Sequence, residues 1–288
     1  MIRRTIRIAL AASLFLLLSA CMPAPLPPYD GTLDEPEDLP VDMGDPVAVA
    51  EGYYATVDGL SGADLKAALN DVISAGLTRY DYDAVWTQLQ YTDEDPANAT
   101  NVLELYTGWS IAKTSNGGDV AQWNREHTWA KSHGDFGELT GPGTDLHHLR
   151  PTDVTVNSRR GSLDFDEGGT AYTDPSPPPG VSSGVTGCSV DADSWEPRDE
   201  VKGDVARMMF YMAVMYEGEG GYDFVDLELN ELVNNGEAPY IGRLSVLKAW
   251  HEADPVSDWE RRRNERIFER QGNRNPFIDH PEWVGLIW

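Results

Sequence analysis

The residues best suited to chemistry lie in one short part of the chain. Four of the six histidines fall within 22 residues, together with carboxylate, amide and guanidinium side chains. The candidates are His127, His133, His147, His148, Glu126, Asp145, Asn157, Arg125, Arg150, Arg159 and Arg160. Carboxylate and amide oxygens suit a hard cation such as Mg²⁺, which keeps several of its waters. A neutral imidazole nearby can take a proton from an attacking water, so the pattern indicates metal-assisted hydrolysis.

Two other interpretations of these residues stay open. Three histidines could hold a zinc ion. Alternatively, His147 and His148 could simply be hydrogen-bonded within the fold, and Asn157 could cap a helix. A cysteine-based zinc site is excluded, because Cys188 is the only cysteine after Cys21. For the same reason no internal disulfide can form after Cys21, and the fold must be held by its core.

The elements that must position these residues are mostly helices. One is predicted from Ser61 to Gly76, with Asp64 at the capping-box position. Its apolar stripe consists of Leu65, Leu69, Val72 and Ile73. Further helices are predicted just after Asp83, from Asp199, over residues 241–252 and over residues 257–271. The helix from Asp199 has an apolar side, predicted to be core, made of Val205, Met208, Met209, Met212 and Tyr216.

Strands are predicted around the candidate site. Residues 101–107 are expected to form one strand and residues 123–129 the returning strand, with Asn116-Gly117 as a typical hairpin turn. Residues 161–197, rich in proline, glycine and serine, are predicted to be a long surface loop. The fold class is therefore α+β, a mostly helical single domain over residues 51–288.

The N-terminus predicts export. Three arginines precede the apolar run from Ile8 to Leu18, which is too short to span a membrane and typical of a signal peptide. Leu18-Ser19-Ala20-Cys21 resembles the lipobox of bacterial lipoproteins. Residues 1–20 are therefore predicted to be a lipoprotein signal peptide, and Cys21 the lipidation site that attaches the protein to a membrane; an ordinary secretory signal is the alternative. Residues 21–50, rich in proline and acids, are predicted to be a disordered stalk. The expected location is the cell envelope, through the lipid, or the extracellular medium.

The chain is strongly acidic, with 48 acids, 22 bases and a formal charge of −26, or −29 without the three arginines of the signal peptide. Such a surface repels a polyanion, so action on one would need a metal ion, a local basic patch or high salt. Arg262, Arg266 and Arg270 share a predicted helix face and could bind phosphate. Glu265 and Glu269 could neutralise this row instead.

The histidine-rich stretch carries a family resemblance. Its sequences NREHTWAKSHGDFG, at residues 124–137, and GPGTDLHHLRPTDVTVNSRRG, at residues 141–161, are similar to motifs of the endonuclease I family of secreted bacterial nucleases. That family uses a ββα-metal finger, also called a His-Me finger. The similarity extends from Gly52-Tyr53-Tyr54 to the last residue, Trp288.

The resemblance implies a role for each matching residue. Glu126 would be a metal ligand, His127 the general base for water, and Asn157 the second metal ligand, on the helix that follows the second strand. Supporting residues on that second strand would be Asp145, His147 and His148. The metal would be Mg²⁺, with Mn²⁺ or Ca²⁺ as substitutes. Adjacent residues of a regular strand point to opposite faces, so Glu126 and His127 are expected at an irregular strand end.

One departure concerns the arginine that stabilises the transition-state phosphate. Disulfide-bonded members of the family carry it shortly after the glutamate, whereas Lys131 is the only basic residue between Arg125 and Arg150 here. Arg160 is predicted to take the role, followed by Arg150 and Arg125 as candidates. Arg125 and Arg159 are also predicted to bind phosphate. The cysteines of those members are absent too, so the chain resembles a cysteine-poor branch.

The predicted function is that of a monomeric, metal-dependent endonuclease acting on DNA, with RNA as a further candidate substrate. Little sequence specificity is expected, because contacts to phosphate carry no sequence information. Two alternatives remain. One is a phosphodiesterase acting on small nucleotides. The other is a non-catalytic surface lipoprotein with a relict nuclease fold, against which the presence of Glu126, His127 and Asn157 argues.

Overall fold

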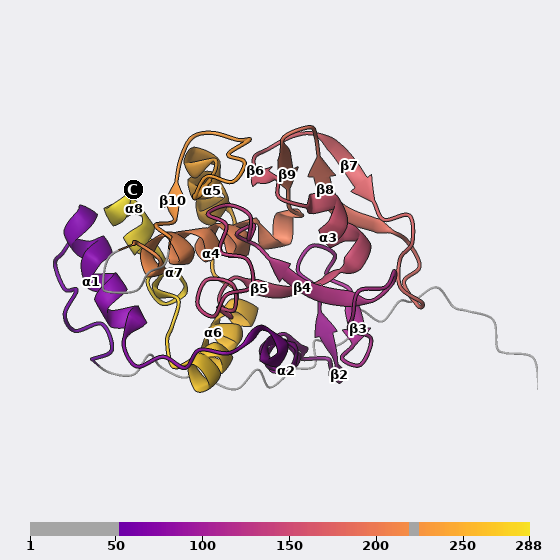
Figure 1. The fold of residues 1–288 in the computed structure, drawn as a ribbon, viewed down its shortest axis with the longest axis horizontal. Coiled ribbons are helices and arrows are strands. Elements are labelled where there is room, and N and C mark those ends of the chain that lie inside the picture. The colour runs from indigo at the N-terminus through magenta and orange to yellow at the C-terminus, as the bar shows by residue number, and fades with distance from the viewer. Residues whose placement is uncertain (1–51, 219–224) are drawn as a thin grey trace, which may run out of the picture. The chain divides into compact units, whose positions relative to one another are not determined.

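The computed structural model describes residues 52–218 and 225–288. All of them belong to the second of the chain's two compact units, Pro40–Trp288. The predicted signal peptide, the stalk and Cys21 lie outside the described residues. Within residues 52–218 and 225–288, we find no helix with the length and hydrophobicity of a membrane span. The described part combines helices with several small sheets, which confirms the α+β prediction (Figure 1).

A strand–strand–helix unit carries the residues singled out above. β4 (Trp123–His127) pairs antiparallel with β5 (Leu149–Asp153) in regular register. α3 (Val154–Arg160) follows β5 without a loop, because the Asp153 carboxylate accepts hydrogen bonds from the first backbone amides of the helix. This is the ββα arrangement that the resemblance implied (Figure 1). Asp145, His147 and His148, however, lie in the turns before β5 and not on the strand.

The hairpin predicted for residues 101–129 is wrong. A different three-stranded sheet forms there, with the order β1 (Glu94–Asp95), β2 (Asn98–Leu103) and β3 (Ser110–Ala112). The chain reverses after β2, where the amide of Gly108, at φ +67°, donates to the carbonyl of Glu104. Asn116 makes a single bridge, to Trp123. The turn signal at Asn116-Gly117 did not determine which strands pair.

A four-stranded sheet occupies part of the segment predicted as a loop. Its order is β6 (Asp164–Phe165), β9 (Ser194–Glu196), β8 (Val185–Val190) and β7 (Thr170–Thr173). Thr186, Cys188 and Val190 of β8 are buried at every second position. This alternation is weak in the sequence because a threonine and a cysteine stand at two of the three inward positions. The loop prediction for residues 161–197 is therefore wrong in part.

Most of the other described elements are helices: five of them were predicted, and two short ones, at residues 276–279 and 284–287, were not. They are α1 (Gly62–Ser74), α2 (Tyr82–Thr92), α4 (Lys202–Met215), α5 (Leu244–Ala253), α6 (Asp258–Gln271), α7 (Pro276–Asp279) and α8 (Val284–Ile287), with 3₁₀ turns η1 (Asp199–Val201) and η2 (Pro281–Trp283) and a small parallel pair, β10 (Glu228–Leu229) and β11 (Tyr240–Ile241). α4 is buried from Gly203 to its end and packs against α1, α5 and α7. Its methionines are core residues, which confirms the prediction.

The helix ends agree only in part with the predicted caps. α6 begins with a capping box between Ser257 and Glu260 and ends at Gly272, whose φ is 89°. At α1, Ser61 holds the N-cap position, but its side chain makes no capping hydrogen bond, so the predicted capping box is wrong. The buried apolar stripe of α1, which packs against α4, is enough to fix that helix.

Candidate functional site

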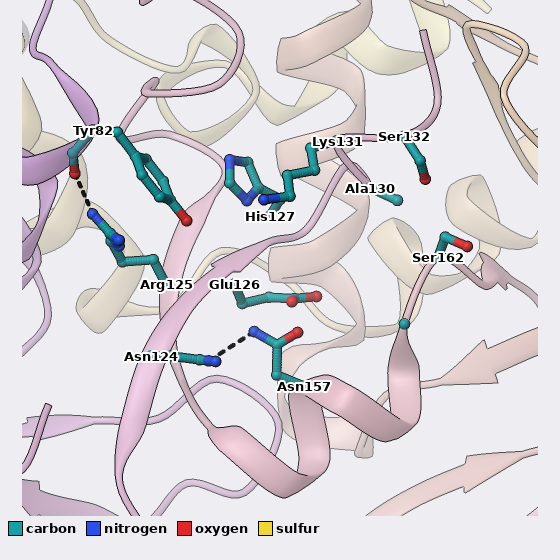
Figure 2. A pocket seen from close by; sticks show the side chains of 11 residues that line it. Tyr82, Asn124, Arg125, Glu126, His127, Ala130, Lys131, Ser132, Asn157 and Ser162 are labelled. Carbon is teal, nitrogen blue, oxygen red and sulfur yellow. Dashed lines mark hydrogen bonds between the residues drawn. The ribbon is translucent and has the colours of Figure 1, made fainter. Parts of the chain in front are cut away.

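A pocket of about 370 Å³ lies beside the end of β4 (Figure 2). β4 lines it with residues 124–127, and the segment after β4 with residues 130–132. Tyr82 from α2, Asn157 from α3 and residues 161–162 complete the wall. The pocket therefore brings together Glu126, His127 and Asn157, the three residues to which the resemblance assigns the chemistry. Their roles stay predictions.

Glu126 presents a carboxylate that is almost wholly removed from water. It is 2% exposed, and its Oε1 accepts a hydrogen bond of 2.9 Å from the Tyr106 hydroxyl. Burial raises the pKa of the carboxyl to about 7, while the Arg160 guanidinium, 3.4 Å from Oε1, opposes the rise. A bound cation would stabilise the ionised form of this buried carboxyl.

Asn157 points its side chain toward Glu126 in the pocket (Figure 2). Its Nδ2 donates to Oδ1 of Asn124 at 2.7 Å, so the amide oxygen is left to face the carboxylate. Two groups that can only accept hydrogen bonds thus meet, and a divalent cation would satisfy both. The described residues contain no group of three or more His, Cys, Asp and Glu that could hold a metal. A cation here would therefore be held by one carboxylate, one amide and water, a ligand set that Mg²⁺ accepts.

His127, the last residue of β4, is oriented by a backbone carbonyl. Its Nε2 lies 3.0 Å from the oxygen of Gly143. Because a carbonyl can only accept, Nε2 must carry the proton and the neutral ring keeps its lone pair on Nδ1. Burial, aided by the nearby His148, lowers the pKa of His127 well below its usual value. The ring stacks on Tyr82, with centroids 5.6 Å apart. The side chain is therefore a neutral base held in one orientation.

Glu126 and His127 are the last two residues of β4, as predicted, but the strand end is not irregular, because both residues pair with β5 in unbroken register. Arg160 holds this end from behind. Its guanidinium donates to the backbone carbonyls of His127, at 3.1 Å, and Thr128, at 2.7 Å. The same side chain is 1% exposed and does not line the pocket. Arg160 is thus placed to orient the carboxylate and the base, not to face a substrate.

Arg150 is also buried away from the pocket. Its Nε donates to Oδ1 of Asp93 at 2.6 Å, and Arg263 donates to the same oxygen at 2.9 Å. Arg150 lies opposite Glu126 in the β4–β5 register, but its side chain is held in a buried ion-pair network with Asp93. The structure therefore does not place this candidate for the phosphate contact at the site.

Two basic side chains do line the pocket, Arg125 and Lys131. The Arg125 guanidinium lies over the rings of Tyr82 and Trp86, at 3.5 and 4.1 Å from their centroids. Lys131 Nζ pairs with Glu138 Oε1 at 2.8 Å. Sequence reasoning named Arg125 but gave Lys131 no role, although it was the one basic residue between Arg125 and Arg150. Tyr82, in α2, carried no sequence signal.

Asn124 and Ser162 are further pocket residues that sequence reasoning missed. Asn124 could have been found, because it lies two positions before Glu126 on the same strand and so shares its face. Ser162 lies just after Gly161, the C-cap of α3, and had no distinguishing pattern. Asn124 matters most, since its hydrogen bond fixes the orientation of the Asn157 amide.

The other three candidate histidines each contact a backbone carbonyl. His147 contacts the carbonyl of Asn273, His148 that of Pro142, and His133 that of Tyr240, at 3.3, 2.7 and 2.8 Å. Asp145 accepts hydrogen bonds from two tyrosine hydroxyls and a glutamine amide, those of Tyr211, Tyr216 and Gln271. These contacts support the turns behind the pocket. They give no support to a zinc ion held by three histidines, and no such group occurs in residues 52–218 or 225–288.

The predicted arginine row on α6 meets acids and rings from elsewhere. Arg262 and Arg266 both approach Oε1 of Glu94, at 3.4 and 3.0 Å, and Arg270 lies over the ring of Tyr91. None of the three lines the pocket. Arg159 is exposed on α3, also outside the pocket wall.

Comparison with known proteins identifies the family. A family model described as Endonuclease I matches residues 61–282, which include β4, β5 and α3. An extracellular ribonuclease of Bacillus amyloliquefaciens is 59% identical over 244 residues, 84% of this chain and 80% of that protein. An extracellular ribonuclease of Bacillus subtilis (strain 168) is 57% identical over the same shares. An extracellular deoxyribonuclease of Aeromonas hydrophila is 27% identical over 151 residues, 50% of this chain and 52% of that protein. The chain belongs to the endonuclease I family.

Proposed function

We propose that this protein is an exported nuclease that hydrolyses phosphodiester bonds of RNA and DNA with a divalent metal ion, Mg²⁺, held by Glu126 and Asn157. The observation that carries the proposal is the convergence of a buried carboxylate, an amide oxygen and a neutral imidazole in one pocket. Mn²⁺ or Ca²⁺ would be substitutes, since both accept the same oxygen ligands.

The chain's own residues would activate and position the attacking water. The Gly143 carbonyl holds the Nε2–H of His127, so Nδ1 accepts a proton from a water in the pocket. The water oxygen bonds to phosphorus and the bond to the 3′-oxygen breaks, which leaves a 5′-phosphate and, after protonation by solvent, a 3′-hydroxyl. A metal ion on Glu126 and Asn157 would supply positive charge for the scissile phosphate and the leaving oxygen. Arg160 contacts both the Glu126 carboxylate and the His127 carbonyl, and so holds the end of β4 in position.

This mechanism needs no 2′-hydroxyl, so both nucleic acids are proposed as substrates. The two relatives above 50% identity bear the name ribonuclease, whereas the more distant Aeromonas protein is named a deoxyribonuclease. RNA therefore stands beside the DNA that the sequence favoured. The residues at the pocket offer charge and hydrogen bonds to phosphate and no groove-reading element, which supports cleavage with little sequence specificity.

The test incubates the protein with supercoiled plasmid and with a long single-stranded RNA, in Mg²⁺ or in chelator. Cleavage of both substrates in Mg²⁺, its loss in chelator and its loss in His127→Ala are the expected results. RNA products should carry 5′-phosphate ends. RNA ending in 2′,3′-cyclic phosphate, or plasmid and RNA that survive every metal, would refute the proposal. Cleavage of a small diester alone would favour the phosphodiesterase instead.

Export is proposed from the sequence and from the names of relatives. Residues 1–20 have the pattern of a signal peptide, and relatives are named extracellular or periplasmic nucleases. Lipidation of Cys21 and a monomeric state complete the proposal. Labelling with a fatty-acid analogue in a bacterial host should mark the wild type and not Cys21→Ala; equal labelling of the two would exclude the anchor.

A further inference from the structure

The pocket lacks an obvious partner for the negative charge that builds on a phosphate under attack. Arg160 binds backbone carbonyls and the Glu126 carboxylate, and Arg150 is paired with Asp93. Each keeps one buried nitrogen without a hydrogen bond, but neither side chain lines the pocket. The basic side chains on the described pocket wall are Arg125 and Lys131. Both belong to the segment that also supplies the base, and both lie near one aromatic ring.

That ring is Tyr82. Its face stacks on His127 at 5.6 Å, the Arg125 guanidinium lies 3.5 Å from its centroid, and Lys131 Nζ lies 5.9 Å from it. Figure 2 shows these side chains grouped on one side of the pocket, with Glu126 and Asn157 on the other. A phosphate held between Lys131, Arg125 and the metal ligands would therefore lie next to the water-activating nitrogen.

Arg125 is held in place yet has donors to spare. The rings of Tyr82 and Trp86 fix the plane of its guanidinium, and one nitrogen donates to the Tyr82 carbonyl. Its Nε–H is buried and has no hydrogen-bond partner among the described residues. A guanidinium whose orientation is fixed in advance binds phosphate with little loss of conformational entropy.

Lys131 is occupied by a partner that a substrate can replace. Its ion pair with Glu138 joins two side chains that are 45% and 50% exposed. Such exposed ion pairs contribute little to stability. A phosphodiester, which carries the same single negative charge as the carboxylate, can therefore replace Glu138 at the ammonium group at small cost. Glu138 also lowers the positive potential at the pocket entrance while no substrate is present.

We propose that Lys131 and Arg125 form the phosphate clamp of this enzyme, and that Glu138 occupies Lys131 until substrate displaces it. This inference rests on the proposed function, because it names the residues that hold the phosphate for that reaction. The clamp would supply the charge-assisted hydrogen bonds that stabilise the phosphorane-like transition state.

The test measures binding and turnover separately. Binding of a fluorescein-labelled single-stranded oligodeoxynucleotide is followed by anisotropy in chelator, where no cleavage occurs, and kcat and KM are measured on the same sequence in Mg²⁺. The variants are Lys131→Ala, Lys131→Arg and Glu138→Gln. Lys202→Ala is the matched control, because this lysine is also ion-paired, with Glu196 and Asp199, and lies outside the pocket wall.

Lys131→Ala should weaken binding about tenfold and lower the salt dependence by roughly one counterion. Lys131→Arg should restore most of the lost affinity. Glu138→Gln should bind the oligodeoxynucleotide about threefold more tightly, because the competing charge is lost. Lys202→Ala should change neither the affinity nor its salt dependence. An unchanged Kd and slope in Lys131→Ala, or an equal loss in Lys202→Ala, would overturn the clamp. Binding that depends on Lys131 without any cleavage would refute the proposed function and leave the clamp standing.

Discussion

Acid should destabilise the protein through His147 and His148, two buried residues in the turns before β5. Burial, the largest cause, lowers the pKa of each side chain from 6.5 to about 4. In the unfolded chain both histidines regain their ordinary pKa. Between the two pKa values the unfolded state therefore binds more protons than the folded state. The stability of the folded state that depends on neutral His147 and His148 is present in full above about pH 6.5 and is lost as the pH falls toward about 4.

The size of the effect follows from the two pKa values. For each histidine, lowering the pH from about 7 to about 5.5 should cost about 1.2 kcal/mol of unfolding free energy. Glu126 and Asp204, whose pKa values burial raises to about 7, act in the opposite direction because they take up protons in the folded state. The pH dependence of the wild type therefore mixes both effects, and a substitution is needed to isolate the histidines.

His147→Gln and His148→Gln provide that comparison, because glutamine keeps an N–H for the carbonyl of Asn273 or Pro142 but cannot titrate. The measurement is urea unfolding followed by tryptophan fluorescence at the two pH values. Each variant should lose about 1.2 kcal/mol less than the wild type between them, and the double variant about twice that. A wild-type pH dependence in both single variants would show that the rings are not held neutral by burial.

Three further predictions concern groups around the site. Arg160→Lys should lower kcat at least about tenfold and leave binding in chelator unchanged, because the guanidinium contacts Glu126 and the backbone and does not line the pocket. Steady-state kinetics measures kcat and anisotropy measures binding. A loss of binding with kcat unchanged would contradict the prediction. Burial raises the pKa of Glu104 well above its usual value, with Asp153 and Asp174 adding to the rise. The contribution of Glu104 to stability is thus present at low pH and lost as the pH rises. Glu104→Gln should therefore stabilise the protein in urea unfolding near pH 8 and change its stability little near pH 4. A destabilisation near pH 8 would show that the charge is needed. Burial raises the pKa of the Cys188 thiol to about 11, so an aromatic disulfide reagent should label it only after unfolding, whereas rapid labelling of the native protein would place the thiol at the surface.

The candidate site could be predicted where the chemistry is local in sequence. Glu126 and His127 are neighbours, and Asn157 lies on the helix that continues from β5, so one continuous stretch places all three at the pocket. The arrangement β4–β5–α3 followed from the same stretch. Tyr82 could not be found in this way, because it reaches His127 from α2, which lies far away in sequence.

The roles of charged residues were harder to predict because their partners are distant. A local i, i+3 argument paired Arg262 and Arg266 of α6 with Glu265 and Glu269. In the structure Glu265 pairs with Arg274, and Glu269 accepts a hydrogen bond from the Tyr91 hydroxyl. Arg150 was a plausible phosphate contact until Asp93, from the end of α2, provided it with a buried partner. Helix periodicity gives the face of a side chain, but tertiary packing decides which group meets it.

The distribution of these ion pairs explains how an acidic chain can act on a polyanion. Arginines are used inside the fold to compensate buried acids: Arg150 and Arg263 at Asp93, Arg207 at Glu260, and Arg274 at Asp279. A buried carboxylate without a cation would cost several kcal/mol, so these pairs allow the acidic composition to fold. Arg125 and Lys131 line the pocket wall. Because long-range attraction is weak on such a surface, we expect specificity for phosphate to come from a few short contacts and from the proposed metal ion, which external salt screens far less than a broad basic patch.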